Sequence, residues 1–137
     1  RRQATVEIEI RTDILFDSGS ATLTHDAEFV IKRIAAVLSR FRNAILVEGH
    51  TDDRPIRTAL FPSNWELSAA RAASVVHVLT QSGVPGRQVT VVGFAEFRPV
   101  ATNDSAEGRN ANRRVLVVVR GTRATEPTAP TATLPPE

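Results

Sequence analysis

Two short apolar runs with a capped helical segment between them constrain the fold of this chain most. Residues 44–49, AILVEG, and 88–94, QVTVVGF, have the length and composition of strands, and the first reads as an interior strand. Between them, Ser63 and Glu66 form the S-x-x-E pattern of a helix start, and Gly83 supplies a stop. Because strand–helix–strand crossovers are normally right-handed, the pattern predicts two parallel strands that end on the same side of one sheet.

Two further strands and one further helix complete the pattern. Residues 5–11, TVEIEIR, alternate apolar and polar side chains, and residues 114–120, RVLVVVR, form a last apolar run. The element order is strand, helix, strand, helix, strand, strand, with a candidate short helix, EGRNANR, before the last strand. This order predicts an α/β sandwich of one sheet against two helices. The first helix should start after the N-cap Thr24, reach about Arg42, and have an apolar face made of Ala27, Ile31, Ile34, Leu38 and Phe41.

Length and composition fit one domain with a tail. The chain has 137 residues, of which 42% are hydrophobic, enough for one core. We expect the domain at residues 1–123. Residues 124–137 hold four Pro and four Thr with almost nothing to bury, so we expect a disordered tail there. The chain begins at Arg1 and has no apolar run long enough to cross a membrane, so we expect any membrane anchor upstream.

Polar side chains gather between the end of the strand 44–49 and the start of the following helix. Asp52 follows the strand, whereas Asn64 and Arg71 lie about 20° apart on one stripe of the helix. Ligands of open α/β sheets bind outside the carboxyl ends of strands, so we expect a ligand site at this place. Because a carboxylate and a guanidinium would face each other there, a zwitterion suits the site. Its amine would pair with Asp52 and its carboxylate with Arg71. A direct Asp52–Arg71 salt bridge that fastens the loop is an equally weighted alternative. On the same helix, Trp65 shares the angle of Ala72 and Leu79, which predicts a core position rather than a ligand contact.

Other functional classes find less support. A glycosidase needs two converging carboxylates, but Asp52 and Asp53 are neighbours whose side chains diverge in an extended chain. His50 and Asp52 form an H-x-D pair, yet a zinc site needs three or four converging ligands and the other histidines are scattered. Nucleic-acid binding through GRNANRR is disfavoured because the run lacks aromatics and the formal net charge is only +2. We expect no enzyme, no metal, no cofactor and no nucleic acid.

Four motifs then occur in a recognisable order: LFDSGSA at 15–21, GHTDD-P with PSNWELSAARA within 49–72, VVGFAEFRPV at 91–100 and GRNANRRV at 108–115. Over residues 13–119 this order resembles the OmpA-like peptidoglycan-binding domain, most closely that of MotB-type flagellar stator subunits. The resemblance implies a two-layer sandwich with a mixed four-stranded sheet.

The resemblance also implies roles for individual residues. Asp52 and Arg71 would hold the diaminopimelate of the peptidoglycan stem peptide, with Asn64 beside them. Phe16 and Asp17 would form another wall of the cleft, and Thr51 and Leu67 belong to the same motifs. The candidate ligand-binding residues are therefore Phe16, Asp17, Thr51, Asp52, Asn64, Leu67 and Arg71.

The implied function is non-catalytic anchoring of a flagellar stator to the cell wall. It implies a periplasmic domain, an upstream inner-membrane helix that this chain lacks, a homodimer and an ion-channel partner subunit. An OmpA- or Pal-type tether between a membrane and peptidoglycan is the alternative, and a peptidoglycan-cleaving enzyme is the disfavoured one. Leu60 and Phe61 could form a dimer or partner surface, line the cleft or cover the core. Arg113 and Arg114, at the start of the last strand, are expected to be structural ion-pair donors.

Overall fold

The computed structural model describes residues 5–121, so both the domain end expected at residue 123 and the tail expected at 124–137 lie outside the described residues. Within this range, no helix is long and apolar enough to cross a bilayer. The elements, in chain order, are β1 (Thr5–Arg11), α1 (Thr12–Leu15), α2 (His25–Leu38), β2 (Ala44–His50), α3 (Asn64–Gln81), a 3-10 turn (Gly86–Gln88), β3 (Val89–Gly93), α4 (Ala106–Asn112) and β4 (Arg114–Arg120).

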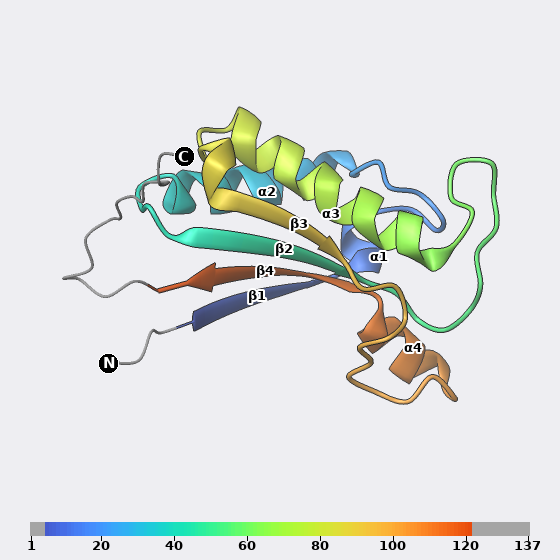
Figure 1. Ribbon diagram of the computed structural model, residues 1–137. Coiled ribbons are helices and arrows are strands. Elements are labelled where there is room, and N and C mark those ends of the chain that lie inside the picture. The colour runs from blue at the N-terminus through green and yellow to red at the C-terminus, as the bar shows by residue number, and fades with distance from the viewer. Residues whose placement is uncertain (1–4, 122–137) are drawn as a thin grey trace, which may run out of the picture.

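The sheet is mixed and has four strands in the order β1-β4-β2-β3. β2 and β3 are parallel, with Ile45 opposite Val89 and Gly49 opposite Gly93, as the crossover rule predicted. β4 lies antiparallel between β1 and β2. Helices α2 and α3 cover one face, and α4 lies beyond the strand ends (Figure 1). The predicted two-layer sandwich is confirmed, whereas α1 and the 3-10 turn were not predicted.

Local side-chain chemistry sets the ends of the two main helices. Thr24 caps α2, since its side chain accepts a hydrogen bond of 3.1 Å from the Ala27 amide. Ser63 caps α3 by accepting from the Trp65 amide at 3.2 Å. The Glu66 carboxylate accepts from the Ser63 hydroxyl, which differs from a capping box, where it would reach a backbone amide.

The core lies between these helices and the sheet. Its fully buried members include Ile31 and Ala35 of α2, Val75 and Leu79 of α3, and Ile45, Val47, Val115 and Val117 of the strands. The prediction for Phe41 was wrong, because α2 ends at Leu38 and the Phe41 side chain is 52% exposed in the following loop. The helical spacing of apolar residues therefore continues in the sequence for three residues after the helix itself has ended at Leu38.

The prediction of a core position for Trp65 was also wrong. Its side chain is 52% exposed and stacks on Phe97, from the loop after β3, with ring centroids 5.2 Å apart. Ala72 and Leu79 share its helical angle and are fully buried because they lie over the sheet. The first turn of α3 projects past the strand ends, where no sheet lies beneath it (Figure 1).

Helix α3 lies directly on the ends of β2 and β3. A Cβ atom at Gly49 would lie 2.0 Å from the Ser68 carbonyl oxygen, and one at Gly93 would lie 2.9 Å from the Ala69 nitrogen. The Ser68 hydroxyl also accepts a hydrogen bond of 3.0 Å from the Ala95 amide. Glycine at these two positions therefore lets the helix backbone touch the sheet, and the contact sets where the first turns of α3 lie.

We expect Gly49→Ala to destabilise the domain by about 3 kcal/mol or more, because the added methyl group overlaps helix backbone that cannot rotate away. Urea unfolding measures the change. Gly86→Ala is the matched control, since a Cβ at Gly86 meets nothing within 4 Å. A Gly49→Ala domain as stable as the Gly86→Ala domain would contradict the close contact.

Candidate functional site

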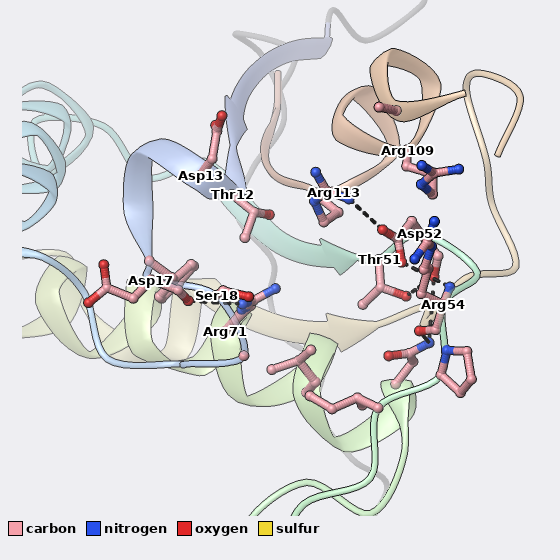
Figure 2. Close-up of a pocket in the computed structure, with 17 residues that line it drawn as sticks. Thr12, Asp13, Asp17, Ser18, Thr51, Asp52, Arg54, Arg71, Arg109 and Arg113 are labelled. Atoms are coloured by element: carbon pink, nitrogen blue, oxygen red, sulfur yellow. Dashed lines mark hydrogen bonds and ion pairs between the residues drawn. The ribbon is translucent and has the colours of Figure 1, made fainter. Parts of the chain in front are cut away.

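One cavity of about 590 Å³ lies at the carboxyl end of β2. The end of β2, the first turns of α3, the segment from α1 to Gly19, and α4 with Arg113 surround it (Figure 2). This size is typical of small-molecule sites. The structure brings all seven candidate ligand-binding residues to its wall: Phe16, Asp17, Thr51, Asp52, Asn64, Leu67 and Arg71. That these residues bind a ligand stays a prediction.

Arg71 is a buried cation in the wall of this cavity. Its side chain lies in the second turn of α3, and the residue is 4% exposed. The guanidinium donates to the Ser20 carbonyl oxygen at 2.8 Å and, at 3.5 Å, to that of Asp17. Burial lowers the pKa of Arg71 to about 10, with the charge of Arg113 acting in the same direction and that of Asp52 opposing it. Arg71 therefore stays charged at neutral pH, and no carboxylate pairs with it among the described residues.

Asp52 lies across the cavity from Arg71 (Figure 2) and is 7% exposed. One carboxylate oxygen accepts from the Arg54 amide at 3.0 Å, and the other pairs with the Arg113 guanidinium. The alternative of a direct Asp52–Arg71 salt bridge was therefore wrong. Arg71 bonds carbonyl oxygens and Asp52 pairs with a different arginine, so the two charges face the cavity separately.

Arg113 as the partner of Asp52 was missed, although its role as an ion-pair donor was predicted correctly. The order of the strands in the sheet brings Arg113 to Asp52: β4 begins beside the end of β2, with Arg114 opposite His50. The sequence order alone does not say which strands are neighbours. For Arg114 the prediction was wrong, since its guanidinium donates to the carbonyl oxygens of Asn112 and Arg98, each at 3.0 Å.

Asn64 and Thr51 hold the loop that carries Asp52. The Asn64 side-chain amide donates to the Arg54 carbonyl oxygen at 3.0 Å and contacts that of Asp52 at 3.5 Å. The Thr51 hydroxyl donates to the Asp52 carbonyl oxygen at 2.8 Å. Both side chains line the cavity, but these bonds direct their donors to the loop backbone. Their contribution in the structure is to position Asp52.

The residues directly after α1 form the wall of the cavity opposite the loop that carries Asp52. Phe16 is buried, and the Arg71 guanidinium carbon lies 5.1 Å from its ring centroid, a cation–π distance. Phe16 also bridges to Leu23, which closes the intervening turn over Arg71. Asp17 lines the same wall, but its carboxylate is not the group that meets Arg71; its carbonyl oxygen is.

Thr12 is a cavity residue that sequence reasoning missed. It is buried, and among the described residues its hydroxyl has no hydrogen-bond partner. Its amide donates to the Arg113 carbonyl oxygen at 2.9 Å, which ties the start of α1 to the chain before β4. No motif singles out this threonine, because its place depends on that pairing of distant segments.

The described residues contain no cluster of three metal-ligating side chains. His50 lies 3.1 Å from the Glu48 carboxylate, and its ring stacks on Phe94 with centroids 5.0 Å apart.

Leu60 and Phe61 were the two loop residues expected to form a dimer or partner surface, line the cleft or cover the core. The structure separates them: Phe61 is buried, whereas Leu60 is 79% exposed.

Comparison with known proteins places this architecture in a family. Residues 15–113 match the OmpA family, and the chain belongs to it. The Motility protein B of Bacillus subtilis is 39% identical over 115 residues, which cover 82% of this chain and 44% of that protein. The chain spans about half the length of the first relatives it matches.

Two solved structures are similar over most of this chain. The structure of the cell wall anchor of the T6SS from Pseudomonas aeruginosa is 44% identical with a TM-score of 0.80, and the match covers 86% of this chain and 82% of that one. The periplasmic domain of Helicobacter pylori MotB is 35% identical with a TM-score of 0.76, covering 86% and 83%. The predicted resemblance to MotB-type domains is thereby confirmed.

The buried histidine beside the cavity predicts a pH dependence of stability. Burial lowers the pKa of His50 below its ordinary value of about 6.5; the hydrogen bond to Glu48 opposes this effect, and the charges of Arg114 and Arg98 add to it. The unfolded chain therefore binds the proton first as the pH falls, so we expect the free energy of unfolding to fall as the pH drops below about 6.5. His50→Gln should reduce this slope in urea titrations across that range, whereas His77→Gln, at an exposed position, should keep it. An equal slope in the wild type and His50→Gln would contradict the assignment.

Proposed function

We propose that this chain is a non-catalytic peptidoglycan-binding domain and that its cavity holds the diaminopimelate of a stem peptide. The family and the similarity to a structure described as a cell wall anchor support the wall as the partner. The chemistry of the cavity supports the part of the wall that it binds.

Arg71 carries the proposal. Taking a guanidinium out of water costs several kcal/mol unless an anion or hydrogen-bond acceptors compensate. Two carbonyl oxygens and the Phe16 ring compensate in part, and no described carboxylate completes the pairing. A ligand carboxylate in the cavity would supply the missing charge and accept from the donors that remain.

Asp52 accounts for the other end of the same ligand. The free end of diaminopimelate bears both an amine and a carboxylate on one carbon, so it is a zwitterion. The Asp52 carboxylate has further acceptor sites beside its bonds to Arg54 and Arg113, and can take an ammonium group. Phe16 and Leu67, both buried and in the cavity wall, suit the methylene chain of the same residue.

The whole protein would use this domain to anchor a flagellar stator. Similarity to Motility protein B and to the MotB periplasmic domain supports that role and a periplasmic location. The role implies paired copies, an ion-channel partner subunit and an inner-membrane helix upstream of this chain. The similarity to the T6SS anchor favours a second candidate, an OmpA- or Pal-type tether in another envelope machine. A strain that lacks the protein but swims normally would favour the tether.

Co-sedimentation with purified, diaminopimelate-containing sacculi tests wall binding. We expect the wild-type domain to pellet with the sacculi, and Arg71→Ala and Asp52→Asn to weaken binding roughly ten- to a hundredfold, since each removes a charge-assisted hydrogen bond. Arg71→Lys should also weaken it, because lysine keeps the charge but lacks the planar fork of donors.

Arg87→Ala is the control for a lost surface charge, since Arg87 is exposed and does not line the cavity. It should pellet like the wild type. Thermal melts of each variant separate lost binding from lost folding. A wild-type domain that stays wholly in the supernatant at low salt would overturn the proposal, as would folded Arg71→Ala and Asp52→Asn domains that both pellet fully.

A further inference from the structure

The largest exposed aromatic group near the cavity is a stacked pair. Trp65 is 52% exposed and Phe97 58% exposed, and their ring planes are inclined by 27°. We call this pair the Trp65–Phe97 platform. Neither ring belongs to the core, and an exposed pair of large aromatic side chains is a common feature of binding surfaces.

Rigid elements hold the platform in place. Trp65 lies in the first turn of α3, where its amide donates to Ser63 and its carbonyl oxygen accepts from the Ser68 hydroxyl at 3.1 Å. Ser68 in turn accepts from the Ala95 amide, on the segment that leads to Phe97. The Phe97 amide donates to the Phe94 carbonyl oxygen at 3.2 Å and closes a turn. Little conformational freedom is then lost when a ligand binds the two rings.

The platform adjoins the cavity through Asn64. Asn64, which lines the cavity, directly precedes Trp65, and Glu96 directly precedes Phe97. The Asn64 side-chain nitrogen lies 3.5 Å from a carboxylate oxygen of Glu96, so these two neighbours meet. A ligand that extends from the cavity past Asn64 would therefore reach the aromatic pair.

We propose that the Trp65–Phe97 platform binds an amino sugar of the glycan strand to which the bound stem peptide is attached. This inference rests on the proposed function, in which the cavity takes diaminopimelate. Diaminopimelate is the third residue of the stem, so in an extended peptide its sugar lies roughly 10 Å away. A pyranose ring presents C–H groups on its faces, and these are attracted to the electron-rich faces of aromatic rings. Glu96 supplies a neighbouring acceptor for a sugar hydroxyl or acetamido N–H.

Calorimetric titration with two soluble ligands tests the platform. One is the stem tripeptide without sugar, and the other is the same tripeptide on its N-acetylglucosaminyl-N-acetylmuramyl disaccharide. We expect the wild type to bind the disaccharide form more tightly. Trp65→Ala should lose about tenfold in affinity for the disaccharide form while keeping its affinity for the tripeptide. Trp65→Phe should keep most of the difference, and Phe97→Ala should reduce it.

Phe29→Ala is the matched control, because Phe29 is an exposed aromatic of α2 that does not line the cavity. It should bind both ligands like the wild type. Equal wild-type affinity for the two ligands would overturn the platform, and so would a Trp65→Ala domain that keeps the full difference or loses affinity for both ligands equally. If the tripeptide itself fails to bind to the wild type, the failure lies in the proposed function and the platform falls with it.

Discussion

The direct contact between helix α3 and the glycines at the ends of β2 and β3 sets the geometry on which the site depends. Gly49 and Gly93 leave no side chain between helix and sheet, and Ser68 bonds across the contact. The first turn of the helix lies beyond the strand ends (Figure 1), and Asn64, Leu67 and Arg71 line the cavity together with the residues that follow β2. Arg71 comes from the helix and Asp52 from the loop directly after β2, and because the backbones of helix and strand touch, the opposed charges are held at a defined separation.

The unequal pairing of these charges would let the cavity be stable without a ligand and still bind the proposed one. Asp52 has a guanidinium partner and a backbone amide, so it is satisfied without ligand. Arg71 has carbonyl oxygens and an aromatic ring, which compensate its burial but leave its charge without an anion in the described chain. The carboxylate of a bound zwitterion would therefore give Arg71 the anion that it lacks, and its amine would join the existing ion pair of Asp52 with Arg113. In the proposed site, this asymmetry would assign most of the carboxylate selectivity to Arg71.

Sequence patterns predicted the elements well where the signal was local. The Thr24 and Ser63 caps are such signals and are present as predicted. The parallel pairing of β2 with β3 is also present as predicted, from the general rule for strand–helix–strand crossovers. The errors concern how far an element or the core extends. Trp65 lies on the same side of α3 as the core residues, but in the first turn of the helix, which extends past the end of the sheet. Phe41 keeps the helical spacing of the apolar residues of α2, but it lies after the helix has ended.

For the cavity, too, the sequence predicted some residues and missed others. Motif spacing, together with the family resemblance, named seven residues that the fold brings to the lining of one cavity. It missed Arg113 and Thr12, because their places depend on β4 lying beside β2 and on the contact of α1 with the chain before β4. Strand order and long-range contacts of this kind leave no periodic trace in a single sequence.

The most direct test of the central claim is a comparison of two stem tripeptides that differ only in the third residue. Diaminopimelate and lysine share the terminal amine, but lysine lacks the second carboxylate. In calorimetric titrations, a site in which Arg71 binds that carboxylate predicts that the wild type prefers the diaminopimelate peptide by roughly tenfold or more. The preference should disappear in Arg71→Ala. Equal affinity of the wild type for the two peptides, or a preference that survives in a folded Arg71→Ala domain, would contradict the account.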